Sequence, residues 1–400
     1  MKKKKMVFLL AAAGMILLGC SRQPADEAQT EAAREELILW SYYETDAQRS
    51  GLSALIGGFN QSQNQYHMTW EYVPMTDFDK ELSRSYTEQE LPDMVLIDNP
   101  DMPAFMRMGI FEDITDRIGD WDLLEEYYPA ALETVRLDGR YYGIPFICNN
   151  LGLIYNTEML EEAAIDPPEN WEELRKAAAA LATEERSGFL MCAISSEQGA
   201  FQIIPWILGA GEEADEIGGR LTEQTYSFLN SLVEEGSMSA DCINLSQTDV
   251  ARKFIAGETA MMENGPWILS MLDKAGVPYG IAKFPEGARE AMITGGENIG
   301  IVRGKNVDGA LAFLQYCQGG KVMENFCKNT GALPARRENA RKLTQSQPKL
   351  QVFADQMEYA IPRTSIPEWN TISESLTSNF YSMISGEITP RRAANAIGIK

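Results

Sequence analysis

Side chains that could recognise a ligand fall where predicted strands end and turns begin. They are Tyr42, Tyr43, Glu44, Asp98, Asn99, Asn149, Phe201, Trp267, Glu297 and Trp369. Aromatic rings can cover the C–H faces of a ligand, while carboxylates and amides exchange hydrogen bonds with its hydroxyl groups. If a sheet brings these residues to one cleft, the resulting surface suits a neutral, polyhydroxylated molecule. Each aromatic residue could also be an ordinary member of the core.

The sequence gives little support for an enzymatic reaction. His67 is the only histidine, and it lies in an alternating, strand-like stretch, which disfavours a Ser-His-Asp triad. The motifs G-x-S-x-G, H-E-x-x-H, the P-loop and G-x-G-x-x-G are absent, so no cofactor or metal is expected. A glycoside hydrolase stays open, because it needs only two carboxylates and the chain holds 58 acidic residues.

Residues 254–267 (FIAGETAMMENGPW) predict the local structure that positions one of these side chains, Trp267. Gly257 is expected to end a helix, residues 259–262 to form a strand, and Pro266 to open the next helix. Trp267 then lies in the first turn of that helix at the end of a strand, where open α/β sheets receive ligands. The alternative is that Trp267 packs between helix and sheet.

The N-terminal part of the chain alternates strands and helices. Residues 37–40 form a short apolar strand, and Leu52, Leu55, Ile56 and Phe59 have helical spacing. Residues 66–73 alternate as a strand does, and residues 92–98 resemble a buried parallel strand. This βαβαβ order predicts an α/β fold with a doubly wound sheet.

The rest of the chain continues the alternation. Asp138-Gly139 predicts a hairpin, and Asn170 with Glu173 predicts the capped start of a helix. Further strands are expected at 149–156, 189–194, 203–208 and 295–302. Helices are expected at 121–135, 222–235, 248–256, 308–317, 321–328 and 372–384, with a short one after Pro390.

The N-terminus has the pattern of an export signal. Lys2 to Lys5 precede the apolar residues 6–18, a run too short to span a bilayer. The run ends in Leu-Leu-Gly-Cys20, which looks like a bacterial lipoprotein signal whose Cys becomes lipidated. Residues 21–36 are polar and predict a flexible tether.

Charge and length limit the partners and the domain count. The formal charge is −23, and loss of the four lysines Lys2 to Lys5 makes it −27. This excess argues against nucleic acid and against direct binding to anionic lipid. The roughly 364 residues after the tether suggest two lobes rather than one. Five cysteines remain beside Cys20, without C-x-x-C spacing, so neither a disulfide framework nor a zinc site is indicated.

Several of these stretches, in this order, carry a family resemblance. The motif at residues 254–267, F-x-x-G-E-T-A-M…N-G-P-W, resembles a motif of the extracellular solute-binding proteins of carbohydrate ABC importers, the maltose-binding-protein-like group. Similar matches are LPDMV (91–95), DGRYYGIP (138–145), LIYN (153–156) with NWEE (170–173), GALP (331–334) and residues 362–369. The resemblance covers nearly all of the chain after the tether.

The resemblance implies a two-lobed periplasmic-binding-protein fold of type II with three crossings. The lobes would be residues 37–147 plus 296–345 and residues 148–295 plus 346–400. Trp267 and Trp369 would stack on sugar, with Phe201 where the family usually has tyrosine and Asn149 where it can have a carboxylate. Tyr43, Glu44 and Asp98 would supply polar contacts from the first lobe.

The implied function is a monomeric, non-catalytic receptor. It would bind a mono- or oligosaccharide, deliver it to an ABC permease, and be held by lipid on the extracytoplasmic face of the membrane. No Trp lies within 94–97 and Asn370 follows Trp369, so the sugar is left open. Alternatives are the same fold with ferric iron or a peptide, a secreted glycoside hydrolase, or a sensor that reports sugar to a membrane kinase.

Overall fold

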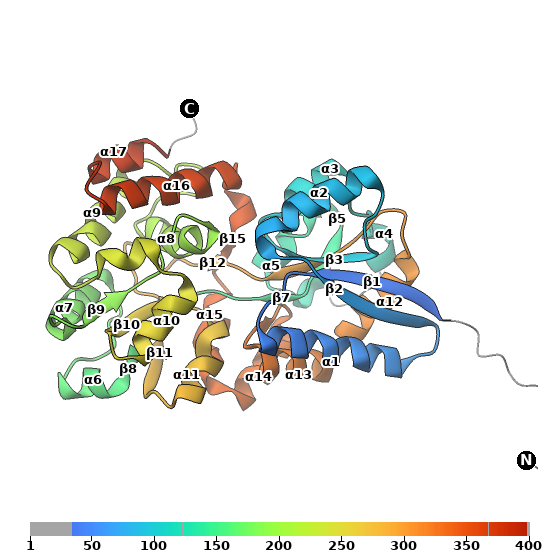
Figure 1. Cartoon of the computed structure of the whole chain (residues 1–400), viewed down its shortest axis with the longest axis horizontal. Helices are drawn as coiled ribbons and strands as arrows, with labels where there is room; N and C mark the ends of the chain where they lie inside the picture. Colours follow the sequence, from blue (N-terminus) through green and yellow to red (C-terminus); the bar gives the residue numbers. More distant parts are fainter. Residues whose placement is uncertain (1–33, 120, 122–123, 367, 398–400) are drawn as a thin grey trace, which may run out of the picture. The chain divides into compact units, whose positions relative to one another are not determined.

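The computed structural model describes residues 34–119, 121, 124–366 and 368–397. Two β-sheets organise them (Figure 1), and the first has the order β2-β1-β3-β13-β6. β1 runs parallel to β2 and β3, whereas β13 runs antiparallel to β3 and β6. Its strands are β1 (Glu35–Ser41), β2 (Tyr66–Tyr72), β3 (Met94–Asp98), β6 (Gly143–Pro145) and β13 (Glu297–Ile301). The predicted parallel start of the sheet is confirmed.

The first βαβ unit follows from its sequence. Met94 to Ile97 in β3 are fully buried, as expected for a parallel strand covered on both faces. α1 (Asp46–Ser62) buries the predicted stripe of Leu52, Leu55, Ile56 and Phe59, and Thr45 with Gln48 forms a capping box at its start. β1 begins at Glu35, within the stretch predicted as tether, while the predicted signal and Cys20 lie outside the described residues.

Helices pack around the first sheet and include segments from late in the chain. α1 packs against α13, and α12 contacts β1 (Figure 1). The continuous helix predicted over residues 121–135 is interrupted, since the described residues of this stretch form two short helices instead of one. The buried Tyr127 and Tyr128 lie between those two helices, and Pro129 starts the second. The elements are η1 (Met75–Asp77), α2 (Phe78–Glu88), α3 (Met102–Met108), α4 (Thr115–Ile118), η2 (Leu124–Glu126), α5 (Pro129–Glu133), β4 (Arg136–Leu137), β5 (Arg140–Tyr141), β7 (Ile147–Cys148), α12 (Val307–Cys317), α13 (Gly320–Thr330), β14 (Leu333–Pro334) and α14 (Arg337–Ser346).

The second sheet has the order β11-β8-β10-β9. β10 runs antiparallel to β8 and parallel to β9, and β11 runs antiparallel to β8. Its strands are β8 (Gly152–Asn156), β9 (Ser187–Leu190), β10 (Thr259–Asn264) and β11 (Tyr279–Ala282). The other elements are α6 (Thr157–Glu162), α7 (Trp171–Leu181), α8 (Glu197–Gly209), α9 (Arg220–Glu234), η3 (Ala240–Asn244), α10 (Gln247–Ile255), η4 (Pro266–Ile268), α11 (Leu269–Ala275), β12 (Ile293–Thr294), η5 (Pro348–Leu350), α15 (Gln351–Gln356), β15 (Ile361–Pro362), η6 (Arg363–Ser365), α16 (Trp369–Ile384) and α17 (Pro390–Asn395).

The strand predicted at residues 203–208 is wrong, because this run belongs to helix α8. Every residue of α8 from Gly199 to Gly209 is buried. The helix contacts α9, α16 and β12, and Trp206 packs edge-on against Phe189 at 5.9 Å between ring centroids. A helix that is apolar on all sides shows no polar stripe, so periodicity cannot distinguish it from a buried strand.

Two segments lie side by side where the chain passes from one sheet to the other. The Phe146 N–H donates to the Glu297 carbonyl at 2.9 Å, and Asn149 and Gly295 exchange backbone hydrogen bonds at 3.0 and 2.8 Å. Gly296 has φ of +119°, and a Cβ there would lie 2.3 Å from the Ile147 carbonyl oxygen. Only glycine fits this close approach.

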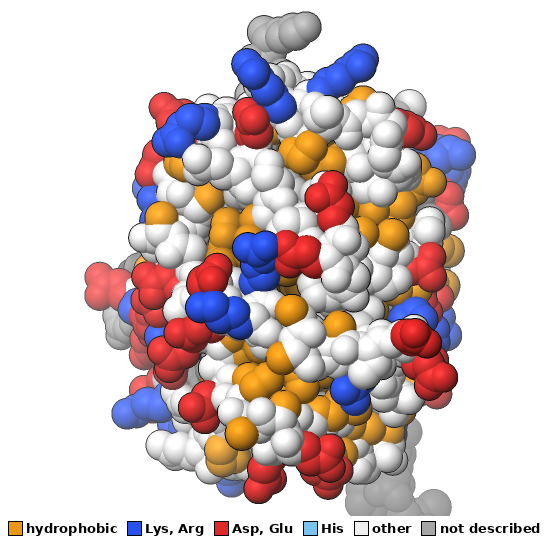
Figure 2. Space-filling view, turned by 90° about the vertical axis from the view of Figure 1, so that its left-hand side faces the viewer, with side chains coloured by type: hydrophobic (Ala, Val, Ile, Leu, Met, Phe, Trp, Pro, Cys, Tyr) orange, Lys and Arg blue, Asp and Glu red, His pale blue; other side chains and the backbone are white. Residues whose placement is uncertain are grey.

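Among the residues that the structure describes, no helix combines the length and apolarity that a bilayer crossing needs. Acidic, basic and hydrophobic side chains are interspersed on the face of the molecule at the α7 and α9 end (Figure 2).

Candidate functional site

The site is built on the ends of β3 and β13. Asp98, the last residue of β3, pairs in register with Glu297, the first residue of β13. Residues directly opposite each other in an antiparallel pair point to the same face of the sheet, so the two carboxylates share one side. Asn99 follows Asp98 and is buried, and its backbone N–H donates to Asp98 Oδ1 at 2.8 Å.

Arg363 joins this strand end to the elements of the second sheet. It is the first residue of η6, directly after β15, and its side chain is 3% exposed. Its Nη2 donates to Asp98 Oδ1 and to Asn99 Oδ1, both at 3.0 Å. Its Nη1 donates to Glu197 Oε1, and the guanidinium lies 4.9 Å from the centre of the Phe201 ring. Charge-assisted hydrogen bonds of this kind are strong when they are buried.

Glu197 links α8 and α16 to Arg363. It occupies the first turn of α8, where the helix dipole favours a carboxylate. The Trp369 indole N–H donates to Glu197 Oε1 at 3.0 Å, and the Ser373 hydroxyl donates to Oε2. We call Asp98, Asn99, Asp101, Glu197, Glu297, Arg363, Trp369 and Ser373 the Arg363 cluster.

Burial and mutual repulsion perturb the carboxyl groups of the cluster. Burial raises the pKa of Asp98 and of Glu197, although the charge of Arg363 opposes the rise in both. Burial, helped by the charge of Asp98, raises the pKa of Glu297 to about 8. Burial and the charges of Asp98 and Asp79 raise the pKa of Asp101 well above its ordinary value. Perturbed carboxyl groups gathered in this way are typical of functional sites.

Aromatic rings border the Arg363 cluster. Trp267 is half-buried in η4, directly after β10, and its ring centre lies 6.2 Å from that of Phe201 at a tilt of 48°. The predicted order of helix, strand and Pro-initiated turn around Trp267 is confirmed. A Cβ added to Gly295 would meet both Asn149 Oδ1 and the Phe201 ring, so these two residues are neighbours.

Tyr42 and Tyr43 reach the cluster from the end of β1. Burial, with the charges of Glu297 and Asp98, raises the pKa of Tyr42 well above its usual range. Tyr43 packs in parallel with Phe326 at 6.4 Å between ring centres and is buried, and burial and the charge of Glu297 raise its pKa. Glu44, by contrast, is exposed.

The structure therefore brings most of the predicted residues together. These are Tyr42, Tyr43, Asp98, Asn99, Asn149, Phe201, Trp267, Glu297 and Trp369, whereas Cys20 lies outside the described residues. Sequence reasoning missed Asp101, Glu197, Arg363 and Ser373. Arg363 lies inside the stretch 362–369 singled out by resemblance, and Glu197 precedes the apolar run that holds Phe201, so proximity to those stretches was the available signal.

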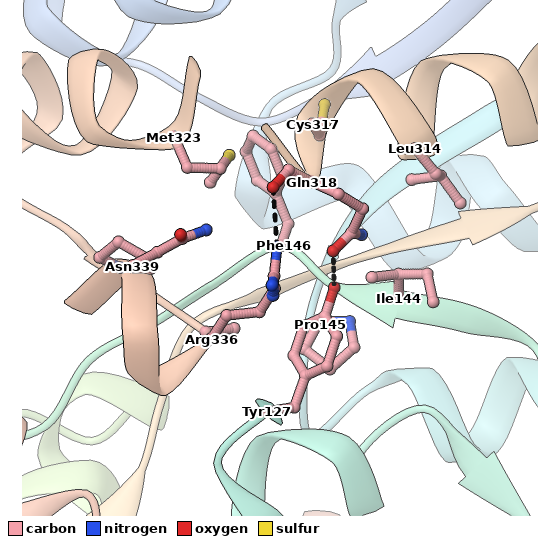
Figure 3. A pocket seen from close by; sticks show the side chains of 12 residues that line it. Tyr127, Ile144, Pro145, Phe146, Leu314, Cys317, Gln318, Met323, Arg336 and Asn339 are labelled. Atoms are coloured by element: carbon pink, nitrogen blue, oxygen red, sulfur yellow. Dashed lines mark hydrogen bonds between the residues drawn. The ribbon is translucent and has the colours of Figure 1, made fainter. Parts of the chain in front are cut away.

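A small cavity lies elsewhere, beside the first sheet (Figure 3). Its volume is about 20 Å³, enough for one water molecule and far too small for a sugar. Tyr127 donates to Gln318 Oε1 at 2.9 Å, and Arg336 donates to the Gln318 carbonyl at 2.8 Å. None of the predicted ligand residues lines this cavity. Within the described part of the chain, no group of three or more His, Cys, Asp or Glu side chains is arranged to hold a metal ion.

Comparison with known proteins agrees with this architecture. The family described as bacterial extracellular solute-binding protein matches residues 54–352. The chain belongs to this family. As solute-binding proteins, its members bind their ligands rather than transform them, and they act outside the cytoplasm.

Two solved solute-binding proteins and one curated relative illustrate the likeness. The GacH receptor of Streptomyces glaucescens, solved with acarbose, has a TM-score of 0.79 and 22% identity over 92% of this chain and 97% of its own. A Thermotoga lettingae solute-binding protein bound to α-D-tagatose has a TM-score of 0.80 and 20% identity over 91% and 99%. The galactooligosaccharide-binding protein of Bacillus subtilis is 21% identical over 98% of this chain and 95% of its own. The two-lobed fold of these solute-binding proteins is thereby established.

Proposed function

We propose that this protein captures a mono- or oligosaccharide between its two lobes and delivers it to an ABC permease, without transforming it. The observation that carries the proposal is Arg363. Its guanidinium links Asp98, at the end of the first sheet, to Glu197, at the start of α8, beside the rings of Phe201 and Trp369. Carboxylates and amides next to aromatic faces match the hydroxyl groups and C–H faces of a sugar.

The proposed ligand contacts come from both lobes. Asp98, Asn99, Glu297 and the tyrosines at the end of β1 belong to the N-terminal lobe, for which we propose residues 37–147 plus 296–345. Asn149, Phe201, Trp267 and Trp369 belong to the C-terminal lobe, proposed as 148–295 plus 346–400. Glu44 is exposed, and we retain it as a contact that closure would bring to the ligand. A ligand that touches both lobes only when they are closed favours the closed state.

The N-terminus supports a lipid-anchored location on the extracytoplasmic face. Lys2 to Lys5, the apolar run after them and Cys20 have the composition of a lipoprotein signal, and the polar stretch that follows suits a tether. We propose cleavage before Cys20 and acylation of its thiol, with the protein acting as a monomer. Intact mass spectrometry of the membrane-extracted protein tests this, because acylation adds the mass of lipid chains that a Cys20→Ala variant lacks.

The relatives support the ligand class. Three of them bind acarbose, α-D-tagatose and galactooligosaccharide, respectively. They range from a monosaccharide to oligosaccharides, so neither the length nor the identity of the sugar follows from them. Because all three ligands are saccharides or saccharide analogues, we extend only the ligand class, a sugar, to this chain.

A thermal-shift screen over a broad glycan library tests the proposal. A ligand present at a hundred times its dissociation constant should stabilise the fold by about 2.7 kcal/mol. Peptides, ferric iron and aryl glycosides complete the panel. Flat melting curves with all sugars, together with a shift by a peptide or by ferric iron, would reject the saccharide. Turnover of an aryl glycoside that is lost on substitution of one carboxylate would reject the non-catalytic role.

A further inference from the structure

The Arg363 cluster holds four carboxyl groups and a single guanidinium group. The carboxyl groups are those of Asp98, Asp101, Glu197 and Glu297. For each of them, Arg363 is the basic residue with the largest effect on the pKa, which it lowers. Both terminal nitrogens of Arg363 are already engaged, by Asp98 and Asn99 on one side and by Glu197 on the other. Two carboxyl groups, those of Asp101 and Glu297, therefore have no cation of their own in the cluster.

Glu297 also has an unused hydrogen-bonding atom. The residue is 9% exposed. A side-chain hydrogen bond with Tyr42 lowers its pKa, but its Oε2 has no hydrogen-bond partner among the described residues. Glu297 faces the same side of the sheet as Asp98, so this oxygen belongs to the side on which Arg363 approaches. The hydroxyl of Tyr43, 1% exposed and acted on by the charge of Glu297, is likewise unpartnered. A buried acceptor without a donor costs free energy unless a ligand supplies one.

Three kinds of ligand can be weighed against this arrangement. An anionic sugar would add negative charge beside four carboxyl groups. Both terminal nitrogens of Arg363 are held by Asp98 and Glu197, so only its buried Nε, which has no partner among the described residues, could donate to the anion. A neutral sugar would satisfy the open oxygen of Glu297 with a hydroxyl donor but would leave Glu297 and Asp101 without a cation. An ammonium group would satisfy the oxygen and also lower the electrostatic free energy of the whole cluster.

We propose that the saccharide carries a free amino group, and that its ammonium form donates to Glu297 within the Arg363 cluster. The ligand class is thus an amino sugar or an amino-substituted oligosaccharide. This inference rests on the proposed saccharide-binding function and narrows it. Arg363 then acts as an internal counter-charge that holds Asp98 and Glu197, leaving Glu297 and Asp101 for the ligand.

Isothermal titration calorimetry with matched ligand pairs tests this inference. Glucosamine and its oligomers are compared with their N-acetylated forms, and further 2-amino and 6-amino sugars with their hydroxyl counterparts. The full chain should bind at least one free amine about tenfold or more tightly than its uncharged counterpart. Glu297→Gln, which keeps the shape but removes the carboxyl group that an ammonium would hold in its ionised form, should abolish most of that preference. Glu184→Gln, at an exposed position outside the cluster, should retain it.

The outcomes separate this inference from the proposed function. Neutral sugars that bind while no free amine outperforms its counterpart would overturn the amino-sugar assignment and leave the saccharide receptor standing. An unchanged amine preference in Glu297→Gln would overturn the role of Glu297. If Glu297→Gln does not fold, as judged by circular dichroism, Asp101→Asn serves as the second variant, with the same loss expected. No binding of any sugar, charged or neutral, would reject the proposed function itself.

Discussion

Replacing Arg363 by methionine removes the buried cation and keeps a side chain of similar length. In the wild-type protein the guanidinium, 3% exposed, donates to Asp98, Asn99 and Glu197. Without it, two partly buried carboxylates lose their counter-charge and the Asn99 carboxamide loses its donor. Breaking a buried ion pair on one side costs about 3–5 kcal/mol of unfolding free energy. We expect a loss in this range at pH 7.5.

The loss should shrink as the pH falls. Asp98 and Glu197 already have a raised pKa, and removal of Arg363 raises it further. A carboxyl group whose folded pKa lies above its unfolded pKa destabilises the native state once the pH exceeds the unfolded value. The deficit of Arg363→Met should therefore be small at pH 4.5, where both groups can be neutral, and should grow towards pH 7.5.

Equilibrium urea unfolding followed by tryptophan fluorescence measures both effects. Arg175→Met is the matched control, because Arg175 pairs with Glu235 at the exposed surface of the second-sheet region, where ion pairs contribute little. A loss of less than about 1 kcal/mol in Arg363→Met at pH 7.5, or one as small as that of Arg175→Met, would contradict the buried cluster. A deficit that does not depend on pH would contradict the raised pKa of its carboxyl groups.

Three further predictions concern the same region and the thiols. Glu297→Gln should make the unfolding free energy less dependent on pH. Because the folded pKa of Glu297 is about 8, this residue lowers the unfolding free energy of the wild type by about 1.4 kcal/mol for each pH unit between its ordinary pKa and pH 8. Urea unfolding at pH 5 and pH 8 should thus show the variant gaining on the wild type at the higher pH, and equal slopes would reject this. Gly296→Ala should lower the melting temperature by several degrees and weaken sugar binding, since its Cβ would clash with the Ile147 carbonyl; an unchanged melting temperature in calorimetry would refute the clash. The five described cysteines are buried, and burial raises the pKa of each thiol, so a maleimide should label them only after unfolding; rapid labelling of the native protein would contradict this.

Local patterns predicted the elements well where one face of an element is exposed. The stripe of α1, the hairpin at Asp138-Gly139 and the turn before Trp267 all follow from spacing and turn chemistry, and all are present. Helix α8 could not be predicted, because burial on every side removes the polar stripe that periodicity depends on. The interrupted region around Tyr127 failed for a related reason, since buried aromatic residues there pack by tertiary contact rather than by helical repeat.

The site was predictable only in part. Aromatic and amide residues at strand ends, such as Trp267 and Asn99, could be found because a strand end has a sequence signature. Glu197 and Arg363 lie 166 positions apart, and no local rule pairs one of 58 acidic residues with one particular arginine. Their partnership arises from tertiary structure alone, which places η6 between the end of β3 and the start of α8.

The central claim is that a saccharide binds beside Trp267, next to the Arg363 cluster. Calorimetric titration of Trp267→Ala with the best sugar from the thermal-shift screen tests it most directly, with Trp70→Ala, a partly exposed tryptophan in β2, as the control. Loss of the stacking ring should weaken binding tenfold or more, while the variant stays folded and Trp70→Ala binds as the wild type does. Unchanged affinity in a folded Trp267→Ala would contradict the account and show that Trp267 belongs to the core.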